Sequence, residues 1–201
     1  EFVGNTATST APGYGFYSAA LVAGDPSSDL SWRSGGNSLP GSPRPGIWTE
    51  GLFARSLSID IAPPDRLHVA RLDVSNALLA VGPGASIGMS DYTPGSMHFW
   101  PGAGFRFCGA LGDAVVVSNF LGLNPWPGLN LHAQSTGLIT WTRVTKALSH
   151  SVSNAVLAAS NTVFEILQDG LSVTDGSQFD AYRVDFSGFV NSGVKITGNS
   201  R

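Results

Sequence analysis

The sequence predicts an all-β domain with an antiparallel β-barrel or sandwich core, long loops and one short helix. Short segments of alternating apolar and polar residues recur at the spacing expected of a sandwich or barrel. Segments rich in Gly and Pro separate them, and the 201 residues include 25 Gly and 12 Pro. A helix signature occurs once, near the C-terminus. A chain of this length can bury a core of its own as one domain.

The N-terminal quarter combines an arm, one strand and a long loop. Residues 1–13 are rich in Thr, Ser, Ala and Gly and are expected to form a linker or flexible arm, whereas residues 14–201 form a single β-barrel domain. The first strand is expected at Tyr14–Val22. Gly, Pro, Ser and Asp dominate Gly24–Gly46, which predicts a long functional or mobile loop. The chain begins at Glu1 and not at Met, which indicates a domain of a longer polypeptide.

Strands dominate the rest of the chain. Ile47–Ile61 and Arg66–Val81 are strand-rich, and a turn with two prolines, Ala62–Asp65, separates them. Loops rich in Gly and Pro are expected at Gly82–Gly95 and Gly122–Asn130. No internal repeat is apparent, so a meander of antiparallel strands is the simplest topology. Further strands are expected at Met97–Trp100, Phe105–Cys108, Ala114–Phe120, Leu138–Leu148, Val152–Ala159 and Phe179–Gly188.

The helix signature begins at Thr162. The Thr162 hydroxyl and the Glu165 carboxylate form a capping box, in which each accepts an amide hydrogen of the first turn. Gly170 supplies a left-handed residue that ends the helix. Phe164 and Leu167 fall on one face, which predicts one or two turns of amphipathic helix on an apolar surface.

The composition argues against nucleic acid and membrane insertion. Charged residues make up 12% of the chain, about half of the usual ~25%, and the formal net charge is −3. No basic stripe is present to bind nucleic acid, and no apolar run approaches the ~20 residues of a membrane span. The surface is therefore expected to consist of Ser, Thr, Asn and Gly, which suits an extracellular medium or sugars.

No metal site, cofactor or disulfide is expected. The histidines are far apart in the sequence, and His68 and His98 lie beside apolar residues, as structural histidines do. The single Cys108 excludes an intramolecular disulfide, and its aromatic neighbours favour a buried structural thiol.

Gly84–Gly88 matches the G-x-S-x-G motif of serine hydrolases, with Ser86 as the nucleophile. The motif requires a helix after the serine, and Pro94-Gly95 leaves no room for a helix of useful length. We therefore interpret the match as a turn, with a serine hydrolase kept as an alternative. A glycosidase is a second enzymatic alternative, although the carboxylates are scattered along the sequence. The domain is expected not to be an enzyme, and no catalytic residue is assigned.

Aromatic residues beside loop signals are the candidates for ligand binding, because their rings offer a large contact area at low entropic cost. Trp126, between two prolines, is the most rigidly placed of them. The alternative is that these rings fold back and fill the ends of the barrel. The predicted ligand-binding residues are Trp32, Arg33, Asp91, Tyr92, Asn124 and Trp126.

Two patches of the sequence resemble a family of viral capsid domains. Leu157–Phe186 contains a small-residue strand, the segment FEILQDGL and the strand FDAYRVDF, and it resembles the end of the hepatitis E virus protruding domain. Gly95–Trp100 resembles a Gly-x-Leu-Ser-Phe-Trp strand of that domain. Astrovirus capsid spikes share the architecture, and the domain length and the polar, Gly-rich loops are similar to those of an avian spike of the turkey astrovirus type.

The resemblance implies a β-barrel spike that projects as a homodimer from a non-enveloped capsid, at the virion surface. It implies attachment to a host-cell receptor, with a glycan as the leading class of ligand, and recognition by neutralising antibodies. It transfers no catalytic residue and no cofactor. A bacterial or phage carbohydrate-binding adhesin is the remaining alternative, and it would not need a two-fold dimer.

Overall fold

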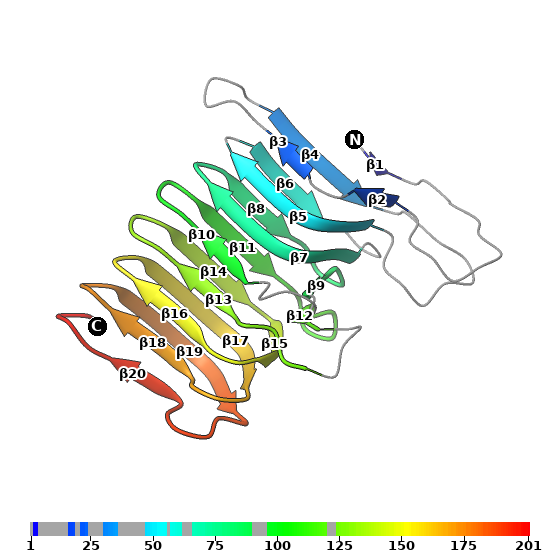
Figure 1. Ribbon diagram of the computed structural model, residues 1–201. Coiled ribbons are helices and arrows are strands. Elements are labelled where there is room, and N and C mark those ends of the chain that lie inside the picture. The colour runs from blue at the N-terminus through cyan, green and yellow to red at the C-terminus, as the bar shows by residue number, and fades with distance from the viewer. Residues whose placement is uncertain are drawn as a thin grey trace.

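The chain folds into a parallel β-solenoid, in which each coil of the chain stacks on the preceding one (Figure 1). This computed structural model describes residues 2–3, 16–18, 21–23, 30–35, 47–55, 57–61, 66–89, 96–119 and 124–201, and it describes the side chains of 72–89, 96–119 and 124–201. The described residues contain no helix, and their strands pair in parallel throughout. The expectation of an antiparallel barrel or sandwich with one helix is therefore wrong.

The described part of the chain contains twenty strands. They are β1 (Phe2–Val3), β2 (Phe16–Ser18), β3 (Leu21–Ala23), β4 (Leu30–Gly35), β5 (Ile47–Arg55), β6 (Leu57–Ile61), β7 (Arg66–Ser75), β8 (Leu78–Val81), β9 (Ser86–Met89), β10 (Met97–Phe99), β11 (Gly104–Cys108), β12 (Val115–Ser118), β13 (Leu129–Leu131), β14 (Thr136–Thr140), β15 (Thr142–Ala147), β16 (His150–Ser153), β17 (Val156–Ile166), β18 (Leu171–Thr174), β19 (Gln178–Ser187) and β20 (Val194–Ile196).

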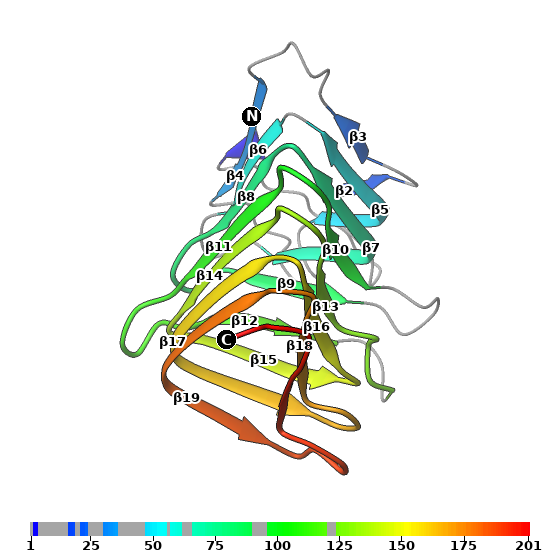
Figure 2. The ribbon, with the colours of Figure 1, turned by 90° about the vertical axis from the view of Figure 1, so that its left-hand side faces the viewer.

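The coils bend at three corners, so that the strands form three flat faces around a common interior (Figure 2). Face A contains β3, the second halves of β5 and β7, and then β10, β13, β16, β18 and β20. Face B contains β1, β4, β6, β8, β11, β14 and the first halves of β17 and β19. Face C contains β2, the first halves of β5 and β7, then β9, β12, β15 and the second halves of β17 and β19.

The register shows a structural repeat of about 20 residues. Arg143 pairs with Val163, 20 positions later in the chain. Met97 pairs with Leu129, 32 positions later, because longer connections are inserted in that coil. The expectation of no internal repeat is therefore wrong. The repeat is hidden by these insertions and by the variety of side chains that one interior position accepts.

Residues with positive φ make the corners. At the corner between faces A and B they include Asn76 (φ 48°), Gln134 (φ 62°) and Asn154 (φ 49°), and at the corner between faces B and C they include Asn161 (φ 50°) and Arg183 (φ 53°). One left-handed residue turns an extended chain sharply, and Asn and Gly adopt this conformation most readily. Each corner thus needs only one unusual residue.

The interior is apolar because inward-facing side chains stack from coil to coil. Face A contributes two such columns, and Phe99 of one column lies with its ring centroid 4.4 Å from that of Phe105 on face B. Gly137 is required beside this stack, because a Cβ there would lie 2.4 Å from the Phe105 ring. The two columns of face A are Leu72, Met97, Leu129, His150 and Leu171, and Val74, Phe99, Leu131, Val152 and Val173.

The predicted helix is a strand in the structure. Thr162 and Phe164 lie within β17 and point into the interior, where both are fully buried. The Thr162 hydroxyl donates to the Ser160 carbonyl at 2.9 Å instead of capping a helix. A Cβ on Gly170 would lie 1.8 Å from the Gly193 carbonyl oxygen, so close packing between coils explains this glycine, and not a left-handed helix end.

Two of the predicted loops contain strands. Gly24–Gly46 includes β4, and Gly82–Gly95 includes β9. The expected strands at Ile47–Ile61 and Arg66–Val81 are confirmed as the pairs β5–β6 and β7–β8. Within the predicted arm, Phe2–Val3 forms β1 and pairs with Ser34 and Gly35 of β4.

Candidate functional site

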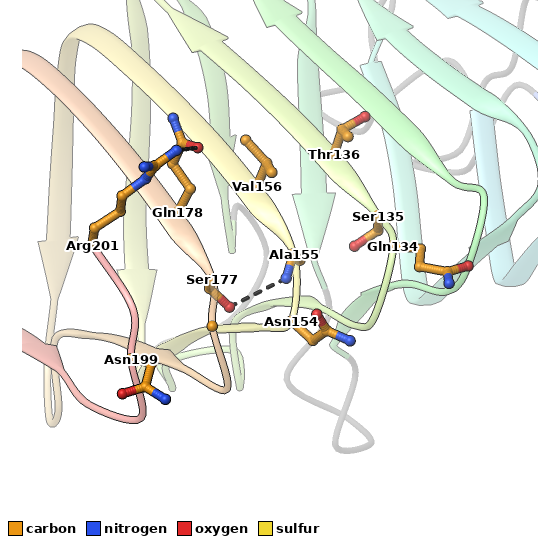
Figure 3. A pocket seen from close by; sticks show the side chains of 11 residues that line it. Gln134, Ser135, Thr136, Asn154, Ala155, Val156, Ser177, Gln178, Asn199 and Arg201 are labelled. Atoms are coloured by element: carbon orange, nitrogen blue, oxygen red, sulfur yellow. Dashed lines mark hydrogen bonds between the residues drawn. The ribbon is translucent and has the colours of Figure 1, made fainter.

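A polar groove runs along the corner between faces A and B, over successive coils (Figure 3). Its volume is about 440 Å³. The turns that precede β14, β17 and β19 form three of its rungs, and the chain after β20 forms the fourth. The lining residues are Gln134, Ser135, Thr136, Asn154, Ala155, Val156, Gly176, Ser177, Gln178, Asn199 and Arg201.

The backbone holds these rungs in register. The Gln134 amide donates to the Asn154 carbonyl at 2.9 Å, and the Gly176 amide donates to the Gly198 carbonyl at 2.8 Å. Asn154 and Asn199 have positive φ, so the chain turns at each of them and their side chains stand at the corner. Adjacent strands are about 4.8 Å apart, and the groove therefore presents polar groups at a regular spacing along the solenoid.

Small hydroxyl residues form the floor of the groove. Ser135 and Ser177 are buried, and the Ser135 hydroxyl donates to the His132 carbonyl at 2.6 Å. The Ser177 hydroxyl accepts a hydrogen bond from the Ala155 amide at 3.2 Å (Figure 3). It donates to the Val152 carbonyl at 3.1 Å. These bonds satisfy the backbone of the turns, so the floor is fixed before any ligand arrives.

Amide groups dominate the exposed part of the groove. Gln134, Asn154 and Asn199 are exposed, and a side-chain amide offers both donors and an acceptor. Gln178 accepts from the Arg201 guanidinium at 2.9 Å and donates to the Asp180 carboxylate at 2.6 Å. None of the described residues that line the groove is an Asp or Glu. The arrangement can bind hydroxyl-rich molecules but offers no pair of acids for glycosidic cleavage.

An aromatic and imidazole cluster lies on the outer surface of face A. The Trp100 ring stacks on the His132 ring with centroids 4.0 Å apart, and His132 in turn stacks on His98 at 5.3 Å. The Trp100 indole donates to the Asp73 carboxylate at 2.8 Å. Partial burial lowers the pKa of His132, and the Asp73 carboxylate opposes this shift. His132 is therefore neutral at pH 7, and it can accept as well as donate a proton.

Of the predicted ligand-binding residues, Asn124 and Trp126 have described side chains, and neither lines the groove. Trp32 and Arg33 lie in β4, outside the part of the chain with described side chains, and Asp91 and Tyr92 lie outside the described residues. Trp126 is fully buried.

The Trp126 indole donates to the Thr145 carbonyl at 2.9 Å, so its ring belongs to the core and is not a presented platform. Asn124 is exposed, and its carbonyl accepts from the Asn119 side chain at 2.9 Å. The groove residues were missed because each of them is an ordinary turn residue in the sequence. Their recurrence about every 20 residues is the signal that could have found them.

Ser86 does not occupy a nucleophile elbow. It lies inside β9, where it is 6% exposed and pairs with Val116, and a strand with buried side chains continues to Met89. In the part of the chain that the structure describes, no three His, Cys, Asp or Glu side chains come together to hold a metal ion. Cys108 is a half-buried free thiol. None of the described segments is a helix long and apolar enough to cross a membrane.

Among the three histidines whose side chains the structure describes, His150 lies fully inside the solenoid. Its Nδ1 accepts a hydrogen from the Leu129 amide at 3.0 Å, which places the ring proton on Nε2. The ring contacts Trp126 and Phe164 edge to face, with centroids 5.9 and 5.4 Å away. Burial lowers the pKa of His150 to about 3, so it is a neutral core residue and has no place in the groove.

Comparison of the chain with family models, with curated proteins and with solved structures finds no match.

Proposed function

We propose that the domain is an attachment domain that binds an extended glycan in the groove between faces A and B. The observation that carries the proposal is the set of side-chain amides at the corner, Gln134, Asn154 and Asn199, on three of the four rungs; the remaining rung has Gly176 at the corner and contributes the amide of Gln178. An extended polysaccharide presents hydroxyl groups at a comparable spacing along one direction. Amides that both donate and accept hydrogen bonds are suited to such groups.

The remaining groove residues support a sugar ligand over other classes. Val156 offers a small apolar surface for the ring carbons, and Arg201 adds one guanidinium that suits a carboxylated sugar. The groove is open and runs along a corner of the solenoid over successive coils. It can therefore accommodate an extended chain as well as a compact molecule. A single cation among uncharged groups would bind nucleic acid poorly.

Two biological settings fit an attachment domain. In the first, the domain is a spike on a non-enveloped capsid, located at the virion surface, where it attaches to a glycan receptor on the host cell, forms a homodimer and is recognised by antibodies. In the second, it is part of a bacterial or phage adhesin. The first setting derived from a segment expected to contain a helix, and the segment forms β17 instead. The described part of the solenoid lacks the short helix on which the resemblance to viral spikes was partly based. We therefore favour the adhesin.

The direct test is saturable binding of the recombinant domain to immobilised oligosaccharides that include neutral β-linked, sialylated and sulfated chains. The informative variants are Asn154→Gly and Asn199→Gly, which remove an amide while glycine keeps the positive φ without strain. Loss of one or two hydrogen bonds should raise the Kd of the preferred chain about tenfold in each variant.

Asn76→Gly is the matched control, because Asn76 also has positive φ at this corner but does not line the groove. It should leave the Kd unchanged. No saturable binding to any chain would refute the proposal, and so would equal losses in the Asn76 and Asn154 variants. Light scattering then separates the settings: a stable dimer supports the spike, and a monomer supports the adhesin.

A further inference from the structure

Ser96 and His98 lie side by side on the outer surface of face A, in and just before β10. The Ser96 hydroxyl oxygen is 2.6 Å from His98 Nε2. Alternate residues of a strand point to the same side, so the two side chains meet without any loop rearrangement. Ser96 is 8% exposed, which limits competition from water for its hydroxyl. A serine hydroxyl at this distance from an imidazole nitrogen has the geometry of a nucleophile and its general base.

The next coil completes a relay of hydrogen bonds. His98 Nδ1 is 3.0 Å from His132 Nε2, and the two rings are stacked with an interplanar angle of 14°. One set of tautomers satisfies both contacts: Ser96 donates to His98 Nε2, and His98 Nδ1 donates to His132 Nε2. His132 thus holds the position that orients the base in a serine triad. Register fixes this relation, since β10 and β13 are paired neighbours.

Two further residues lie next to the relay. Asp73 is in the coil that precedes β10, and Trp100 directly follows β10. The Asp73 carboxylate accepts from the Trp100 indole at 2.8 Å and acts electrostatically on His132. A carboxylate on this side favours positive charge on the imidazole pair when a proton arrives. His132 and Asp73 are therefore positioning residues, and neither needs to touch a substrate.

Asn130 is placed to stabilise a developing oxyanion. It pairs directly with His98 across the coils, and its Nδ2 makes only long contacts, 3.4 Å to the Met97 carbonyl and 3.5 Å to the Gly128 carbonyl. Its Oδ1 accepts from the Ser151 hydroxyl at 2.7 Å, which leaves the NH₂ group facing the carbonyl of Met97, the residue after Ser96. Asn side chains serve as oxyanion donors in acyl transfer.

We propose that this cluster is an ester-hydrolysing site in which Ser96 is the nucleophile and His98 the general base. The Ser96 Oγ forms a bond to the ester carbonyl carbon while its proton passes to His98 Nε2. The bond from carbon to the alcohol oxygen then breaks, and the alcohol leaves with the proton from His98. Water attacks the acyl-serine in the same way, releases the carboxylic acid and restores the serine.

The surroundings select small acyl esters. Trp100 is 36% exposed beside the relay and offers an apolar edge of limited area to an acyl group. Short acyl groups such as acetyl are the substrates that such a surface accommodates. The site lies apart from the groove and has a different chemistry. Ester hydrolysis therefore does not depend on glycan binding, and each can be tested without the other.

The test uses p-nitrophenyl acetate as substrate and a fluorophosphonate as a covalent label, both with the whole domain. Wild type should release p-nitrophenol, and the label should be found on the peptide that contains Ser96. Ser96→Ala should lower kcat by at least about 100-fold and leave only the slow reaction of surface imidazoles. Asn130→Ala should lower kcat by about 10²-fold with little change in KM.

Two further variants separate a positioning role of His132 from a merely structural one. His132→Gln keeps an acceptor for His98 Nδ1 and should retain part of kcat, whereas His132→Leu should lose it. Ser172→Ala is the control, because it removes an outward hydroxyl from the same face without touching the relay. Labelling at another residue, or equal hydrolysis by wild type and Ser96→Ala, would overturn the proposal. Because the label is applied to wild type, a variant that fails to fold does not affect this outcome.

Discussion

His150 should make the stability of the solenoid depend on pH in a way that one substitution removes. The ring is fully buried among Trp126 and Phe164, and its Nδ1 accepts from the Leu129 amide. Burial lowers its pKa from 6.5 to about 3. The native state therefore excludes a proton that the unfolded chain binds below pH 6.5, so stability falls as the pH drops from 6.5 toward 3.

The magnitude follows from the two pKa values. Each unit of difference corresponds to about 1.4 kcal/mol, and the full difference of about 3.5 units corresponds to about 5 kcal/mol of unfolding free energy. Between pH 7 and pH 5 the loss should be about 2 kcal/mol. Protonation of carboxylates adds a separate loss at lower pH, so the comparison is best made above pH 5.

The assay is urea unfolding of wild type and of His150→Gln at pH 7, 6 and 5. The Gln amide oxygen can accept from the Leu129 amide, but it does not titrate. The variant starts less stable, because its NH₂ group is buried, and the difference between the two proteins should shrink by about 2 kcal/mol on going to pH 5. Hydrogen exchange at the Leu129 amide reports the same change locally. Parallel pH profiles for the two proteins would refute the assignment of a neutral buried imidazole.

Substitutions at three further positions test the packing and the corners. Gly137→Ala should lower the unfolding free energy by about 1–3 kcal/mol, since its Cβ would lie 2.4 Å from the Phe105 ring; a neutral result in urea unfolding would contradict the close approach. Asn161→Gly should be nearly neutral and Asn161→Val should destabilise by about 1–2 kcal/mol, because φ is 50°; equal effects of the two on the thermal midpoint would argue against a left-handed corner. Trp126→Phe should lower stability by about 1 kcal/mol through loss of its backbone hydrogen bond and leave glycan affinity unchanged, whereas weaker glycan binding at unchanged stability would restore Trp126 to the ligand site.

Most strands could be predicted from the sequence, but their direction could not. A side-chain period of two residues is the same in parallel and antiparallel sheets, and it located β5 to β8, β10 and β11 within a few residues. Direction depends on which strands pair, and Met97 pairs with Leu129 across 32 positions, which no local pattern reveals. The turn residues between successive strands then favoured hairpins, because strands joined by short turns usually pair antiparallel.

The helix prediction rested partly on Phe164 and Leu167, which are three positions apart, as on one face of a helix. In the structure Phe164 is buried within β17, whereas Leu167 follows the end of that strand and is 38% exposed. The corner residue Asn161 also breaks the simple alternation of β17, so the interior residues Ala159 and Thr162 are three positions apart. At the equivalent corner of β19, Arg183 separates Ala181 from Val184, so Tyr182 lies outside and is 60% exposed, although simple alternation grouped it with Val184.

A dipeptide recurs at the corner between faces A and B, once in each coil whose side chains the structure describes. It marks the coils of the solenoid, and some of its residues line the groove. The first residue adopts a positive φ and the second is small and turns inward, and these pairs are Asn76-Ala77, Gly102-Ala103, Gln134-Ser135, Asn154-Ala155, Gly176-Ser177 and Asn199-Ser200.

The two positions of this dipeptide are under different structural constraints. The second must remain small, because it packs under the turn, as the buried Ser135 and Ser177 do. The first must only tolerate a left-handed backbone, and Gly, Asn and Gln each meet that requirement here, so its side chain can vary with little effect on the core. Stability in a solenoid is close to a sum over coils and their neighbours, so such changes stay local. Recognition can therefore change at the corner residue, one coil at a time, while the fold is retained. This is why Asn154→Gly is expected to separate glycan affinity from stability.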